Sequence, residues 1–144
     1  MYRKMLCAGA AVLALLFAAV CQAGDKYEEA SELFEEYVPA LENYLDAVET
    51  AQSAGAFAKA INAFADEMAE LAPKMRELNR KYPELQNEQS VPPKYAELEQ
   101  KADALGGRFG QSFIRIAPFM EDPEVEKANE RLMTIMESMV PEGE

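Results

Sequence analysis

Residues 57–82 read FAKAINAFADEMAELAPKMRELNRKY, and apolar side chains recur along them at alternating spacings of four and three. The recurring residues are Phe57, Ile61, Phe64, Met68, Leu71, Met75, Leu78 and Tyr82. This heptad period is typical of one face of an α-helix, whereas a half-buried strand alternates every second residue. Charged and amide side chains lie between the apolar positions, as they do on the solvated side of an amphipathic helix. The stretch therefore predicts a long helix over residues 56–82.

The same pattern continues on both sides of this segment. Upstream, an apolar stripe from Tyr27 to Ala51 predicts a helix over residues 26–52. Downstream, two further stripes predict helices over residues 93–118 and 123–139. The whole chain after the N-terminal segment is therefore expected to be helical.

Prolines mark some helix ends and fall inside other helices. Pro83 ends the second predicted helix because its ring and its missing N–H cannot continue the hydrogen-bond ladder, and residues 83–92 are expected to form an extended polar loop. Pro39 and Pro73 instead lie on the side of a helix furthest from its apolar stripe, so we expect each helix to bend there and continue. The alternative is that the first helix begins at Pro39, with residues 25–37 as a separate segment.

Four amphipathic helices with short connections predict an all-α fold. The expected architecture is an antiparallel up-down-up-down four-helix bundle over residues 24–140, with a frayed tail over residues 141–144. The fourth helix is predicted to be the shortest. Folded back on the third helix, it stops before the end of the bundle at which the first helix begins, and it leaves the apolar stripes uncovered there.

This uncovered end is rich in tyrosine and supplies the candidate binding residues. The residues expected there, beside the polar loop, are Tyr27, Leu78, Tyr82, Tyr95 and Leu98. A tyrosine at the edge of a core buries its ring and leaves its hydroxyl in water. Exposed apolar surface of this kind is typical of sites that bind a partner or a ligand. We therefore expect this end to bind a protein partner or a second copy of the chain as a homodimer.

The N-terminus has the three-part plan of a secretory signal peptide. Arg3 and Lys4 precede an uncharged apolar run that ends at Val20, and small residues precede a cleavage position after Ala23. Residues 1–23 are therefore predicted to be a signal peptide. Its removal on export leaves a periplasmic chain without a membrane span.

Two other interpretations of this segment stay open. The apolar run can serve as an uncleaved anchor, although it is short for a membrane span. The chain can also be a lipoprotein acylated at Cys21. Against lipidation, Ala18 stands where a large aliphatic residue is usual, and Val20 is bulky for the position next to the cysteine.

Cleavage after residue 23 also limits the chemistry of the mature chain. Both cysteines, Cys7 and Cys21, leave with the signal peptide, and the sequence has no histidine. These absences exclude an imidazole base, a thiol nucleophile and a Cys/His zinc site. Loss of Arg3 and Lys4 from the 14 basic residues leaves 12 against 26 acidic residues, a formal charge of −14 that repels nucleic acid. We expect a non-enzymatic protein with no cofactor and no nucleic-acid partner.

A methionine motif near the C-terminus supplies a second candidate function. Met133, Met136 and Met139 are spaced three residues apart, and soft thioether sulfur atoms on this spacing can converge on Cu(I) or Ag(I). The alternative is that these side chains fill gaps in the core. The motif therefore predicts, beside the partner-binding hypothesis, a carrier of a soft metal or of another small ligand.

In architecture the chain resembles the soluble periplasmic four-helix cytochromes of the b and c-prime types. The resemblance lies in a signal peptide followed by amphipathic helices, and in residues 47–68, AVETAQSAGAFAKAINAFADEM, which are similar to the first helix–helix corner of that family. It implies a four-helix bundle. The haem ligands of the family, a histidine in the last helix and a methionine near the start of the first, have no counterpart here.

Overall fold

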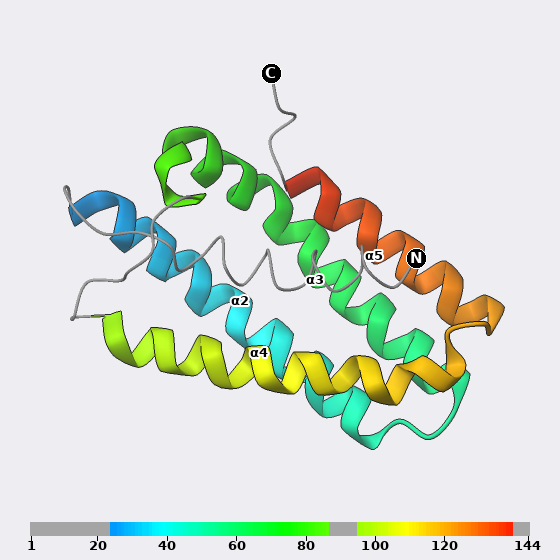
Figure 1. The fold of residues 1–144 in the computed structure, drawn as a ribbon. Coiled ribbons are helices and arrows are strands. Elements are labelled where there is room, and N and C mark those ends of the chain that lie inside the picture. The colour runs from blue at the N-terminus through cyan, green and yellow to red at the C-terminus, as the bar shows by residue number, and fades with distance from the viewer. Residues whose placement is uncertain (1–23, 87–94, 140–144) are drawn as a thin grey trace.

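The computed structural model of the chain describes residues 24–86 and 95–139 (Figure 1). The elements are α2 (Gly24–Thr50), α3 (Ala54–Lys81), the short 3₁₀ helix η1 (Pro83–Gln86), α4 (Ala96–Ile116), the 3₁₀ turn η3 (Ala117–Phe119) and α5 (Pro123–Met139). Within these two ranges there are four α-helices and no strands, which confirms the all-α prediction. The predicted signal peptide with Cys21, the loop beyond residue 86 and the tail 141–144 lie outside the described residues.

Local sequence explains where the helices begin and continue. Ser53 precedes α3 with an extended backbone, and its hydroxyl accepts a hydrogen bond from the Ala56 amide at 3.3 Å. The Asp122 carboxylate accepts from the Glu124 amide at 2.9 Å in the same way at the start of α5. Pro39 lies exposed inside α2, which runs through it as one helix, as predicted.

The packing of α2 against α3 forms the centre of the core. Lys74 of α3 pairs with Glu36 of α2, and Lys81 of α3 pairs with Glu29 of α2. A later residue of α3 therefore meets an earlier residue of α2. This is the order expected of two antiparallel neighbours. The pair is joined by only three residues, 51–53. Both helices bury a wide face along almost their whole length.

The main neighbour of α5 is α3. This differs from the prediction that the last helix folds back on the third predicted helix, which is α4. Beside its stripe of large residues, α3 buries a second stripe at seven-residue intervals, formed by Ala58, Ala65, Ala72 and Asn79. Small side chains let two helix axes approach closely. The Asn79 amide donates to the Met139 backbone oxygen at 3.2 Å, so this second stripe faces α5.

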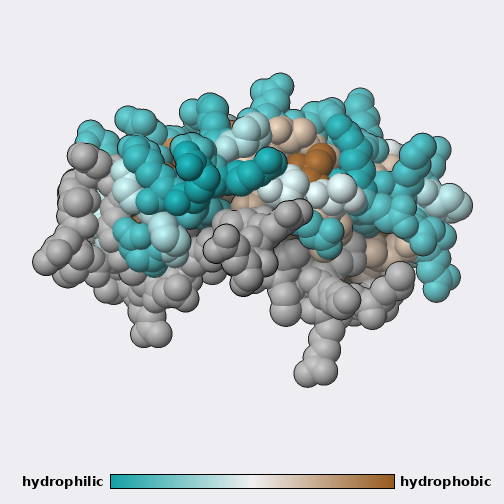
Figure 2. Space-filling model, turned by 90° about the horizontal axis from the view of Figure 1, so that it is seen from above, coloured by the Kyte–Doolittle hydropathy of each residue, from teal (hydrophilic) through white to brown (hydrophobic). Residues whose placement is uncertain are grey.

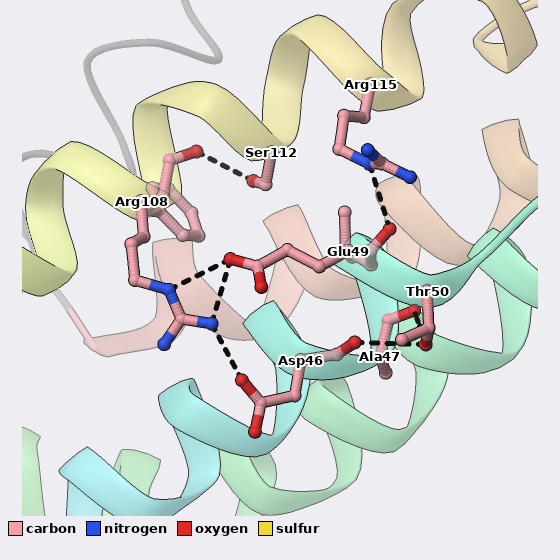
Figure 3. Close-up of polar contacts among 9 residues, drawn as sticks. Asp46, Ala47, Glu49, Thr50, Arg108, Ser112 and Arg115 are labelled. Carbon is pink, nitrogen blue, oxygen red and sulfur yellow. Dashed lines mark hydrogen bonds and ion pairs between the residues drawn. The ribbon is translucent and has the colours of Figure 1, made fainter.

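The corresponding neighbour of α2 is α4. Figure 3 shows Arg108 reaching from α4 to two carboxylates of α2, at 2.7 Å from Asp46 and 2.8 Å from Glu49. Two turns further along α4, the Arg115 guanidinium donates to the backbone oxygens of Val48 at 3.2 Å and Ala51 at 3.5 Å. These carbonyls belong to the last turn of α2 and to the residue just after it, where no helical N–H follows to bond them. Arg115 therefore caps α2 from the neighbouring helix.

The segment after α3 also differs from its prediction. Residues 83–92 were expected to be an extended polar loop, but Pro83–Gln86 form a 3₁₀ turn in which the Leu85 amide bonds the Tyr82 carbonyl at 3.0 Å. This turn places Leu85 in the core, with 2% of its surface exposed. The sequence pattern already indicated that Leu85 is buried, because Leu85 continues the alternating spacing of three and four residues beyond Tyr82.

In the part of the chain that the structure describes, no helix has both the length and the apolar composition needed to cross a bilayer.

Replacing Ala65 by leucine is expected to lower the free energy of unfolding by about 1–3 kcal/mol, because the added carbon atoms have no room between α3 and α5. Ala65 is fully buried. The control is Ala69→Leu, at an exposed position on the same helix, which should change stability by less than about 0.5 kcal/mol. Urea unfolding followed by far-UV circular dichroism measures both. Equal effects of the two variants would show that the alanine stripe does not limit the approach of α5.

Candidate functional site

We call the five residues predicted at the uncovered end the tyrosine end. The prediction that the last helix stops short of this end is wrong on the α3 side, because the Asn79 amide of α3 donates to the Met139 oxygen at the end of α5 at 3.2 Å. The five residues come from the start of α2, the end of α3 and the start of α4, three helix termini that Figure 1 places at the same end of the molecule. The rings of Tyr27 and Tyr95 lie 5.9 Å apart between centroids, which joins α2 to α4. The ring contact places the start of α2 beside the start of α4.

Burial divides the tyrosine end into a base and a surface layer. Tyr27 and Leu78 are buried, and both belong to the hydrophobic core. Tyr82, Tyr95 and Leu98 are half-buried and pack on that core from outside. Large apolar side chains with one side packed and the other accessible form a platform that a partner can cover without first ordering it.

Charged residues surround the platform on the α3 side. The Tyr82 hydroxyl donates to the Glu29 carboxylate at 3.2 Å, and the Lys81 ammonium also pairs with Glu29. The same ammonium lies 5.1 Å from the centre of the Tyr82 ring, within the range of a cation–π contact. The hydrogen bond with Glu29 raises the pKa of Lys81 above its ordinary value. The Tyr82 ring is therefore held by contacts at its edge and its face.

The three methionines of the C-terminal motif do not share one environment. Met136 and Met139 are buried in the core, while Met133 is half-buried. Burial of two members is what the core-filling interpretation of the motif predicts. Among the described residues, no group of three or more His, Cys, Asp or Glu side chains is placed to hold a metal ion.

Two further tyrosines lie in the core rather than at the surface. Tyr44 stacks on Phe64 with ring centroids 4.8 Å apart and is hydrogen-bonded to Ser112 of α4. Burial raises the pKa of Tyr44 to about 12, with the Ser112 bond acting in the opposite direction. Burial also raises the pKa of Tyr37, with the charge of Tyr44 as a further cause. Both phenols stay protonated in the folded chain at neutral pH.

Exposed apolar surface is scarce on the described residues. Among the described residues visible on the face in Figure 2, most are hydrophilic, with a small hydrophobic area between them. Ile114 is the large hydrophobic residue that the structure leaves exposed, at 75% of its surface. It stands alone on α4 and is no more than an ordinary exposed side chain.

No family model, curated protein or solved structure matches the chain. The residues themselves therefore carry the functional argument.

The two buried tyrosines predict a loss of stability at high pH. An unfolded tyrosine loses its proton near pH 10, whereas folded Tyr44 keeps it until about pH 12. The free energy of unfolding therefore keeps its full value below pH 10. It falls as the pH rises toward 12, by about 1.4 kcal/mol per pH unit for each such phenol. Urea unfolding at several pH values between about 9 and about 11.5 measures how steeply the free energy of unfolding falls with pH. Tyr44→Phe should reduce the slope, and an unreduced slope would show that Tyr44 titrates normally in the folded chain.

Proposed function

We propose that the protein is an exported, non-enzymatic helical-bundle protein that binds a protein partner through the tyrosine end. In this proposal the partner is a second copy of the chain. The observation that carries it is the contact of Tyr27 with Tyr95, because it fixes aromatic rings from two helices on one platform. Tyr82, Tyr95 and Leu98 remain half-buried on that platform and supply the binding surface.

Tyrosine is well suited to such a surface. Its ring covers a large area with few rotatable bonds, so little conformational entropy is lost on binding, and tyrosine is enriched among the residues that dominate interface energies. At the tyrosine end the rings are already positioned by core contacts and by the Glu29 hydrogen bond. Symmetric pairing about a two-fold axis would bring the same surface of each copy together.

We further propose that the four helices are arranged as an up-down-up-down bundle, with α4 beside α2 and α5 beside α3. The order of the polar contacts supports this arrangement. Glu42 pairs with Lys101 at 3.5 Å, and Asp46 pairs with Arg108 at 2.7 Å. Later residues of α2 therefore meet later residues of α4, as expected of two helices that run in the same direction. The opposite order between α2 and α3 supports alternating directions along the chain.

The charge of the mature chain sets a condition on self-association. Two copies that each carry a formal charge of −14 after signal cleavage repel one another, and this repulsion weakens as salt shortens the screening length from about 30 Å at 0.01 M to about 6 Å at 0.3 M. Pairing through the tyrosine end should therefore strengthen as salt is added. Binding of a basic partner protein would weaken instead.

Self-association is tested by size-exclusion chromatography with light scattering at about 0.01 M and about 0.3 M salt. We expect a dimer that is favoured at the higher salt concentration, and the double variant Tyr95→Ser/Leu98→Ser should weaken it at least about tenfold. Ile114→Ser is the control, because it removes an exposed apolar side chain elsewhere on α4. A chain that stays monomeric at both salt concentrations, or a double variant that dimerises like the parent, would contradict the proposal.

The soft-metal alternative has its own test in the methionine motif. We expect replacement of Met133, Met136 and Met139 by leucine to leave any Cu(I) affinity unchanged, because two of the three sulfur-bearing side chains are buried core residues. Competition titration against a Cu(I)-chelating dye measures the affinity, and circular dichroism checks the fold. Loss of tight Cu(I) binding in the folded triple variant would favour the carrier function.

A further inference from the structure

A groove lies between the first turns of α3 and the first turns of α5, away from the tyrosine end. Its volume is about 470 Å³, within the range of sites for small molecules. Ala58 of α3 and Ala128 of α5 are buried at its base, where the alanine stripe lets the two helices approach. Longer side chains on both helices form its walls.

The walls carry more positive than negative charge. Lys59 of α3 and Lys127 and Arg131 of α5 line the groove, against one lining carboxylate, that of Glu124. Acidic residues outnumber basic residues 26 to 14 in the whole chain, so this balance is opposite to the average. The groove is therefore a local positive region on an acidic protein.

The two lysines of the groove differ from the other lysines whose side chains are described. Lys74, Lys81 and Lys101 each pair with a carboxylate on α2. For Lys59 and Lys127 the structure has no ion pair or hydrogen bond. Lys59 lines the α3 wall and Lys127 the α5 wall of the same groove, and both side chains are exposed.

Arg131 is held in place on the α5 side of the groove. Its guanidinium pairs with Asp66 and donates to the Asn62 side-chain oxygen at 3.3 Å. Asp66 offsets part of its charge, so Arg131 shapes the wall more than it attracts an anion. Glu124 lies at the end of the groove, with its carboxylate 3.4 Å from the position of a Cβ on Gly55. Glycine at position 55 leaves that carboxylate space beside α3.

We propose that this groove binds a small dianion, such as inorganic phosphate or a dicarboxylate, with its anionic oxygens bridging Lys59 and Lys127. The start of α3 lies at this end (Figure 1), and the positive end of its helix dipole favours the same charge, whereas the start of α5 already carries the Asp122, Glu124 and Glu126 carboxylates. The site goes beyond the proposed partner binding, since it shares no residue with the tyrosine end. An anion with a single negative charge would neutralise only one of the two lysines.

The exposure of both lysines sets the expected strength of binding. Lys59 and Lys127 are exposed, and exposed ion pairs are weak and screened by salt. We expect a dissociation constant on the order of 1 mM at low ionic strength, weakening as sodium chloride is added. Each lysine should contribute about threefold to the affinity, and the two together about tenfold.

The test is a titration of the protein, as recovered from its host, with sodium phosphate and, separately, with sodium succinate. Two-dimensional ¹⁵N–¹H NMR at low ionic strength follows the backbone amides that line the groove. We expect saturable shifts confined to the starts of α3 and α5, weakened about threefold in Lys59→Gln and in Lys127→Gln and about tenfold in the double variant. Stronger binding of phosphate or of succinate identifies which dianion the spacing suits.

The control variant is Lys101→Gln, which changes the net charge equally but removes an ion pair with Glu42 on the far pair of helices. It should bind each dianion within a factor of about two of the parent. Far-UV circular dichroism confirms that every variant is folded. The proposal is overturned if neither dianion gives saturable shifts in the groove. It is also overturned if the double variant binds no more weakly than Lys101→Gln, since the affinity would then follow overall charge.

Discussion

The packing of α2 against α3 determines where every other helix lies. Each of these two helices buries a wide face, one part against its partner and another part against a flanking helix. An amphipathic helix needs a surface for its apolar stripe, and α4 finds that surface on α2 whereas α5 finds it on α3. The tyrosine end and the groove between α3 and α5 follow from this arrangement, because they form at opposite ends of α3.

Ion pairs between helices set the alignment of this acidic chain more than its stability. They connect α2 to α3, α2 to α4 and α3 to α5, and most of their side chains are exposed. Exposed pairs contribute about 0–1 kcal/mol each, so the buried side chains supply most of the stabilisation. Arg108 bridges two carboxylates on successive turns of α2, and this geometry favours one relative position of the helices over a shift by a turn.

Much of the helical structure could be predicted from sequence because large apolar residues repeat with a clear period. That pattern placed Tyr27, Tyr82 and Tyr95 at one end, and the structure brings them there. The packing of α5 on α3 could not be predicted in the same way, because α5 packs on small alanine side chains that do not belong to the stripe of large residues. Leu85 was missed because its polar neighbours hid a continued stripe. The groove was also missed, since Lys59 and Lys127 are far apart in sequence and neither belongs to a motif.

The three-residue connection between α2 and α3 bears on the order in which the molecule assembles. Contacts within this hairpin join residues close in sequence, so little chain entropy opposes them and they can form early in folding. The contact of Asn79 with Met139 instead closes a loop of about sixty residues, which costs more entropy to bring together. The last helix therefore docks late, onto a hairpin that already exists.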